Sequence, residues 1–212
     1  MDDIIQVKNV TKRFKKFVAL NNVTVSFEKG KIHGLIGRNG SGKTVLMKVI
    51  LGLMKPSDGE IIVEGKKVGN DIETPENIGA IIETPGFLDN YSGYMNLKFL
   101  ADIKRIAGKN EIRETIKLVG LEPDDKKHVG KYSLGMRQRL AIAQAVMEKQ
   151  EILMLDEPMN GLDKSGVEQI RKILKELKNQ GKTIIIASHN SEDIAELCDT
   201  VYEMDMGVIT KI

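Results

Sequence analysis

The feature that most constrains the fold is a glycine-rich turn, GRNGSGKT at Gly37–Thr44, set between two segments of different periodicity. The segment before it, KIHGLIG, is almost continuously apolar, which is typical of a strand buried on both faces of a sheet. The segment after it, at about residues 42–52, has the apolar spacing of a helix. This succession predicts a largely parallel sheet covered by helices.

The residue types of the turn fit phosphate binding. Glycines let successive backbone N–H groups converge on phosphate oxygens, and the N-terminal end of the following helix favours negative charge. Lys43 is expected to reach the β- and γ-phosphates, and the Thr44 hydroxyl is expected to bind Mg²⁺. The predicted nucleotide-contacting residues are Gly37, Asn39, Gly40, Ser41, Gly42, Lys43, Thr44 and Val45.

Two carboxylates follow a second buried segment, ILMLDEP at Ile152–Pro158. Open α/β sheets bind ligands at the carboxyl ends of their strands, so Asp156 and Glu157 are expected to face the same site as the turn. Asp156 is predicted to hold Mg²⁺, directly or through water. Glu157 is placed to polarise a water for in-line attack on the γ-phosphate. A solvated strand end is the alternative, which the four preceding apolar residues disfavour.

His189 follows a third buried segment, TIIIAS. Its strand is expected near the strand that precedes the turn, with its carboxyl end facing the same crevice, so we predict a γ-phosphate contact. Glu157, His189 and Lys43 form the predicted catalytic set. His33 and His128 have no such setting and are predicted to be structural or exposed.

Alternating apolar and polar residues near the N-terminus, in IIQVKNV and NNVTVSFE, indicate half-buried antiparallel strands. Helical spacing dominates from about Thr84 to Glu148, after which strands and helices alternate again. The predicted fold class is α/β: a P-loop nucleotide triphosphatase core with a mainly parallel sheet, an N-terminal antiparallel β subdomain and an inserted α-helical subdomain. We expect a single domain over residues 1–212, with its core at 1–83 and 151–212 and the helical subdomain at about 84–150.

Composition excludes several classes of protein. The 32 basic and 30 acidic residues leave a net charge of +2, and no long run of one sign suggests a nucleic-acid partner. No apolar run approaches the roughly 20 residues that span a bilayer, and the acidic start does not resemble a signal or transit peptide. The lone Cys198 fits a reducing compartment and is read as a small apolar residue.

A further stretch, YSLGMRQRL at Tyr132–Leu140, sets a serine and a glycine at the mouth of a helix, a combination that the local fold does not require. Together with the other motifs it completes a recognisable order: KRF, GRNGSGKT, NIGAII, YSLGMRQ, LMLDEP, NGLD and SH. In this order the sequence resembles the nucleotide-binding subunit of ATP-binding cassette (ABC) transporters, and the resemblance runs from end to end.

The resemblance implies Mg²⁺-dependent ATP hydrolysis and a homodimer in the ATP-bound state. Each ATP is then held between the GRNGSGKT turn of one subunit and the YSLGM stretch of the other. Ser133 and Gly135 are implied to donate hydrogen bonds to the γ-phosphate bound by the partner, from a helix N-terminus. Phe14 is implied to stack on adenine, with a partly buried aromatic as the alternative. Asp163 of NGLD is implied to cross the dimer interface.

Two departures from the family pattern are informative. The usual Leu-Ser-Gly-Gly-Gln becomes YSLGM, and the effect of Leu134 and Met136 on dimer closure stays open. Glu83, in IIETPGF, stands where most members have a glutamine that binds Mg²⁺ through water and touches the membrane subunit. A carboxylate there adds attraction to the metal and repulsion toward the triphosphate. A solvated loop acid is the alternative reading of Glu83.

Glu83 and the YSLGM stretch together resemble the ATPases of bacitracin and lantibiotic exporters. That branch implies export of an antimicrobial peptide or drug-like substrate through separate membrane subunits. It also implies a cytoplasmic protein that is peripheral on the inner face of the membrane, without direct membrane insertion. A cassette ATPase of DNA repair or ribosome work is one alternative, and the second cassette, coiled coil or metal-binding insertion that it needs is missing from the sequence. A nucleotide sensor without hydrolysis is the other, and Glu157 argues against it.

Overall fold

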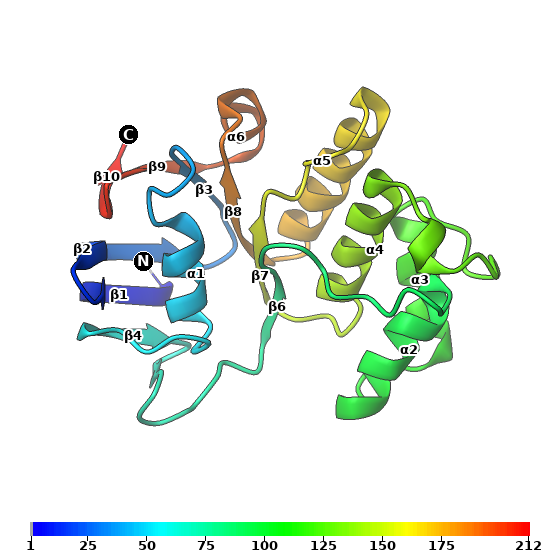
Figure 1. Ribbon diagram of the computed structural model, residues 1–212, viewed down its shortest axis with the longest axis horizontal. Coiled ribbons are helices and arrows are strands. Elements are labelled where there is room, and N and C mark those ends of the chain that lie inside the picture. The colour runs from blue at the N-terminus through cyan, green and yellow to red at the C-terminus, as the bar shows by residue number, and fades with distance from the viewer. Residues whose placement is uncertain (1) are drawn as a thin grey trace.

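The computed structural model describes residues 2–212, apart from the side chains at positions 192 and 193 (Figure 1). The strands are β1 (Asp3–Phe14), β2 (Phe17–Glu28), β3 (Ile32–Ile36), β4 (Asp58–Val63), β5 (Lys66–Lys67), β6 (Ile78–Ile81), β7 (Ile152–Asp156), β8 (Thr183–Ser188), β9 (Thr200–Asp205) and β10 (Val208–Lys211). The helices are α1 (Lys43–Ile50), α2 (Gly93–Lys104), α3 (Lys109–Leu118), α4 (Leu134–Val146), α5 (Lys164–Asn179) and α6 (Ser191–Leu197), with a 3₁₀ turn at Val129–Lys131.

The strands form two sheets. One has the order β10-β9-β3-β8-β7-β6, and all its neighbouring strands are parallel except β9 and β10. The other is antiparallel, with the order β2-β1-β4-β5. The predicted α/β class, with its mainly parallel core sheet and N-terminal antiparallel sheet, is confirmed.

The parallel sheet is buried on both faces because successive residues of its strands point into two different cores. In β8, Ile184 and Ile186 pack in one core with helices α4, α5 and α6. Ile185 and Ala187 pack in the other, with α1 and the antiparallel sheet. Figure 1 shows α1 lying between the two sheets, while α2, α3 and α4 gather on the opposite side of the parallel sheet. This double burial explains the continuous apolar runs of the sequence.

Strand order fixes the place of the functional site. Strands β3, β7 and β8 are neighbours and run in the same direction. The segments that follow them are the glycine-rich turn, the Asp156–Glu157 pair and His189. Because carboxyl ends of parallel strands meet at one edge of a sheet, these segments meet there as well.

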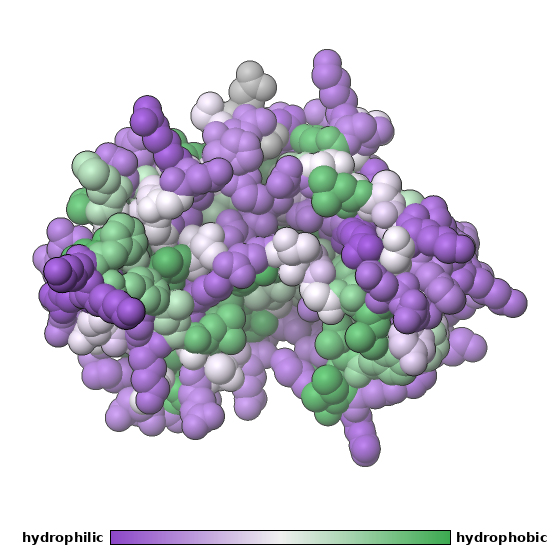
Figure 2. Space-filling view, viewed as in Figure 1, coloured by the Kyte–Doolittle hydropathy of each residue, from purple (hydrophilic) through white to green (hydrophobic). Residues whose placement is uncertain are grey.

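The surface is mostly polar, and Figure 2 shows apolar residues gathered over α2 and over the β1–β2 hairpin. Around α2, Tyr91 and Phe99 stack edge to face with ring centroids 5.0 Å apart. Ile103, which is 77% exposed, continues this apolar area. Within residues 2–212, no helix is long and apolar enough to cross a bilayer.

His33 is a buried structural residue. The sequence analysis predicted that it would be either structural or exposed. Its Nε2 atom donates to the carbonyl oxygen of Glu28 at 2.9 Å, which leaves Nδ1 to accept from the Thr200 hydroxyl at 2.6 Å. The ring also stacks edge to face on Phe27. Burial lowers the pKa of His33 below its ordinary value, against the opposing effect of the Glu28 carbonyl.

We expect acidification to destabilise the protein through His33. The folded state favours the neutral ring, so the unfolded state binds the extra proton. This contribution to the free energy of unfolding is present above the ordinary histidine pKa of roughly 6.5, and it is lost as the pH falls from there toward the lowered folded-state pKa. Urea unfolding of the wild type and of His33→Phe, at about pH 7.5 and about pH 5.5, measures this loss.

His128, which is exposed, supplies the matched control. His128→Gln retains the acid-dependent loss of stability, whereas His33→Phe reduces it. Equal losses in all three proteins would show that other groups cause the pH dependence.

Candidate functional site

The glycine-rich turn is shaped by two close approaches of its backbone to other strands. Gly37 has φ 151°, and a Cβ atom there would overlap the carbonyl oxygen of Met204 in β9. Gly42 has φ 114°, and its Cβ would lie 2.7 Å from the carbonyl oxygen of Ala19 in β2. Glycine is therefore required at both positions by sterics as well as by φ. The turn leads directly into α1, so the N-terminal end of that helix faces the turn.

Lys43 is almost fully buried, and its side chain folds back over the glycine-rich turn. Its ammonium group donates to the carbonyl oxygens of Gly37 at 2.6 Å and Arg38 at 3.2 Å. The Ser41 hydroxyl is also buried, and it has no hydrogen-bond partner among the residues that the structure describes. A buried cation and a buried hydroxyl beside a helix N-terminus fit an anionic ligand.

A cavity of about 420 Å³ opens over this turn. It is lined by Phe17, Ala19, Asn39, Gly40, Ser41, Gly42, Lys43, Thr44, Val45, Asp156 and Glu157. The structure thus brings the predicted residues of the turn from Asn39 to Val45 together with both predicted carboxylates, whereas Gly37 lies outside the lining. Phe17, 61% exposed and opposite Phe14 in the β1–β2 pairing, belongs to the lining, whereas Phe14 itself lies outside it with Lys12 over its ring. Sequence reasoning missed Phe17 because strand periodicity does not show which aromatic of the hairpin faces the turn.

The side chains of Thr44 and Asp156 meet in the lining of this cavity. The Thr44 hydroxyl donates to Oδ2 of Asp156 at 2.7 Å. Burial raises the pKa of the Asp156 carboxyl, and the neighbouring charge of Glu157 acts in the same direction, while the hydrogen bond from Thr44 opposes both. A carboxylate that is costly to ionise in this setting is one that a bound cation would stabilise.

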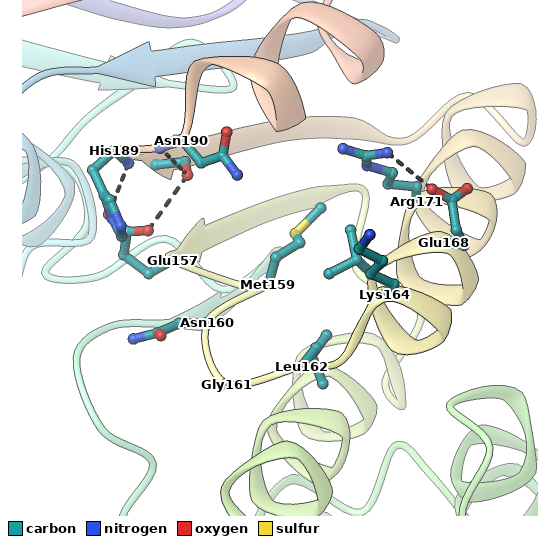
Figure 3. Close-up of a pocket in the computed structure, with 12 residues that line it drawn as sticks. Glu157, Met159, Asn160, Gly161, Leu162, Lys164, Glu168, Arg171, His189 and Asn190 are labelled. Carbon is teal, nitrogen blue, oxygen red and sulfur yellow. Dashed lines mark hydrogen bonds and ion pairs between the residues drawn. The ribbon is translucent and has the colours of Figure 1, made fainter.

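Glu157 is held in an uncommon backbone conformation, with φ 50°. Its Oε1 atom accepts from the backbone N–H of His189 at 3.0 Å and lies 2.9 Å from Nδ1 of the same residue. The Ser188 hydroxyl lies 3.4 Å from Oε2. Figure 3 shows this group at one end of a second cavity, of about 440 Å³, which continues along the Met159–Leu162 segment toward α5. Glu157 lines both cavities, so this residue belongs to the wall of each.

Ser133, Gly135 and Asp163 lie away from the turn, at the N-terminal ends of two helices. Ser133 caps α4, and its hydroxyl accepts from the Met136 N–H at 3.2 Å. Asp163 caps α5 by accepting from the Gly166 N–H at 2.9 Å, a bond that lowers the pKa of the Asp163 carboxyl. Both helix ends therefore have local structural explanations within one subunit.

Glu83 contacts a cation that the sequence did not single out. It has φ 60°, and its Oε1 atom lies 2.6 Å from the ammonium group of Lys48. Lys48 stands one helical turn after Thr44 on α1, which puts both side chains on one face of the helix. The four-residue spacing between Thr44 and Lys48 was the sequence signal that could have identified Lys48 as a residue near the site. The charge of Glu83 is thus balanced by a lysine on the helix that follows the glycine-rich turn.

Together the fold and the cavity define a nucleotide-binding P-loop protein, with a buried lysine in the turn after β3 and two carboxylates at the end of β7, one strand beyond β8 in the same sheet. The chain belongs to the ABC transporter family, whose profile, described as "ABC transporter", matches residues 20–160. It is an ATP-binding subunit of that family and an ATPase. The sequence-based prediction of the family is confirmed.

Among its relatives, the chain is 48% identical to the uncharacterized ABC transporter ATP-binding protein YybJ of Bacillus subtilis, over 96% of this chain and 94% of that protein. It is 41% identical to the bacitracin transport ATP-binding protein BcrA of Enterococcus faecalis, over 98% of this chain and 68% of that protein. The dimeric structure of MJ0796, a bacterial ABC transporter cassette, is similar at a TM-score of 0.87, with 26% identity and 98% of each chain covered.

We expect Gly37→Ala to be much more destabilising than Gly40→Ala. Both glycines have positive φ, but a Cβ at Gly40 meets nothing within 4 Å. Gly40→Ala should lower the free energy of unfolding by about 1 kcal/mol, the cost of the left-handed backbone. Gly37→Ala adds a backbone overlap and should cost about 2–4 kcal/mol. Urea unfolding without nucleotide compares the two, and equal losses would mean that the contact with β9 does not constrain the turn.

Proposed function

We propose that this ATPase powers export of an antimicrobial peptide or drug-like substrate through separate membrane subunits. The observation that carries the hydrolytic part is the Glu157 carboxylate, oriented by His189 and Ser188 at the rim of the phosphate-binding cavity. The transport class is supported by relatives named as bacitracin and lantibiotic transport proteins, the latter SrtF of Streptococcus pyogenes at 37% identity over 93% of this chain and 85% of that protein.

We further propose one domain, with its core at residues 1–83 and 151–212 and a helical subdomain at about 84–150.

The chain's own residues supply positioning and a base. Lys43 and the N–H groups of the turn hold the β- and γ-phosphates, which keeps the phosphorus in line with an attacking water. Glu157 accepts the proton of that water as its oxygen bonds to the γ-phosphorus and the bridging P–O bond to ADP breaks. His189 keeps the Glu157 carboxylate aimed at the water and contacts the γ-phosphate. The products are ADP and inorganic phosphate.

The oxygen atoms at the base of the cavity fit Mg²⁺. A hydroxyl and a carboxylate, from Thr44 and Asp156, are hard ligands of the kind that Mg²⁺ takes in small number beside water and phosphate oxygens. When bound, the metal neutralises charge on the phosphates. Glu83 is proposed to turn from Lys48 toward it.

The ATP-bound form is proposed to be a homodimer. The N-terminal end of α4 offers the Ser133 hydroxyl and the N–H of Gly135, and Leu134 between them is 61% exposed. These donors are proposed to reach the γ-phosphate of the nucleotide bound by the other subunit. Phe14, beside Phe17, is proposed to stack on adenine, and Asp163 to meet the partner across the interface.

The membrane subunits are proposed to dock on the apolar area around α2, which polar residues surround (Figure 2). Exposed apolar patches of this kind mark protein–protein contacts more often than plain surface. Such docking would hold the protein in the cytoplasm, on the inner face of the membrane. It requires neither a nucleic-acid partner nor insertion of this chain into the bilayer.

Glu157→Gln should abolish steady-state phosphate release. Losing a general base typically costs about 100-fold or more in rate, while nucleotide binding stays because the phosphate contacts are elsewhere. The ATP-bound dimer should accumulate and be visible by sedimentation. Glu168→Gln is the matched control. Glu168 lines the second cavity together with Glu157, and this variant should hydrolyse ATP normally. Equal phosphate release by the wild type and Glu157→Gln would remove Glu157 as the base and favour a sensor without hydrolysis.

Lys48→Met should weaken binding of metal-free ATP, because it leaves the Glu83 charge unbalanced near the triphosphate. For a partly exposed ion pair the expected effect is about two- to fivefold in dissociation constant. Lys48→Arg keeps the charge and should bind as the wild type does. Fluorescent nucleotide titrations in the presence of a chelator measure the effect, and Glu83→Gln should restore affinity in the Lys48→Met protein. No restoration would show that Lys48 acts on the nucleotide without Glu83.

A further inference from the structure

A buried amide joins helix α4 to the backbone of Glu157. Gln138 lies one turn into α4 and is only 8% exposed. Its Nε2 atom donates to the carbonyl oxygen of Glu157 at 3.1 Å. The same helix carries Ser133 and Gly135 at its exposed N-terminal end. One rigid element therefore spans from the proposed trans contact to the proposed base.

The backbone at Glu157 needs external support. A φ of 50° is a costly conformation for a residue with a side chain, and it persists where surrounding contacts fix it. The Glu157 N–H donates to the carbonyl oxygen of Ala187 in β8 at 2.9 Å. The Glu157 carbonyl accepts both from Gln138 and from the Asn160 N–H, each at 3.1 Å. Of these three contacts, the bond from Gln138 comes from outside the strands and the turn that carry Glu157.

The N-terminal end of α4 also packs against the segment that follows Glu157. Leu134 covers Gly161 so closely that a Cβ on Gly161 would overlap its side chain. A Cβ on Gly135 would lie 3.1 Å from the Gly161 carbonyl oxygen. Displacement of the first turn of α4 must therefore move the Glu157–Gly161 segment or break these contacts.

We propose that Gln138 is a positioning residue that couples the two nucleotide sites of the dimer. Engagement of Ser133 and Gly135 by the partner's nucleotide fixes the first turn of α4. Gln138 transmits that position to the Glu157 carbonyl, and so to the carboxylate that acts on the subunit's own nucleotide. Hydrolysis at one site then depends on occupancy of the other. This inference rests on the proposed dimer and deepens it.

Gln138→Met tests the coupling in the full-length protein, since methionine keeps the volume and removes the donor. We expect kcat for ATP hydrolysis to fall about tenfold, in line with a loss of orientation, with KM unchanged. The Hill coefficient for ATP should drop toward 1 from a wild-type value above 1 and at most about 2. Gln144→Met, the same change further along α4, is the matched control and should leave all three quantities as in the wild type.

A second readout separates positioning from a general structural role. In a Glu157→Gln background the base is already absent, so adding Gln138→Met should reduce neither residual hydrolysis nor ATP-driven dimer formation further. A further loss in that background, or a raised KM with unchanged kcat, would overturn the proposal. An unchanged Hill coefficient in Gln138→Met would also overturn it.

Leu134→Ala extends the test to an exposed position on the same contact, should Gln138→Met fail to fold. It should lower the Hill coefficient while Tm stays unchanged, and an unchanged coefficient would count against coupling through α4. Failure of the proposed function is distinct from failure of this inference. It would appear in the wild type, as absence of hydrolysis or of an ATP-driven dimer, before any variant of α4 is measured.

Discussion

The parallel pairing of β3, β7 and β8 is the constraint on which the site depends. Their backbone hydrogen bonds align three strand ends in one plane, and each end is followed directly by a functional segment. Both faces of the sheet are buried, so a one-residue change of register would move each apolar side chain into the opposite core and disturb the packing of both. The position of Lys43, Asp156 and His189 relative to one another thus follows from main-chain pairing rather than from contacts between these side chains.

Charge is distributed around this edge so that each ionised group has a local counterpart. Lys43 is held by carbonyl oxygens, Asp156 by the Thr44 hydroxyl, Glu157 by His189 and Glu83 by Lys48. Burial raises the pKa of the Asp156 carboxyl, so its negative charge is costly in this setting. A bound triphosphate with its cation would change all of these balances at once.

The N-terminal ends of α4 and α5 serve two purposes. Ser133 and Asp163 cap their own helices, so each contributes to the fold of the isolated subunit. The same caps leave helix N-termini facing outward, where an anion or a second subunit can be met. Gln138 links the first of these ends to the backbone beside the cavity. In the proposed dimer, this contact would connect the subunit's own nucleotide with that of its partner.

The sequence by itself determined the fold class, the family and the glycine-rich turn with its two carboxylates, because these depend on local periodicity and on residue types at fixed spacing. Helix α5 was predictable from its apolar face for the same reason. The ion pair of Lys48 with Glu83, the place of Phe17 in the cavity and the bond from Gln138 to Glu157 were decided only by the tertiary structure. Each joins elements far apart in the chain, and no local pattern encodes which side chains the packing of separate elements brings within a few ångströms.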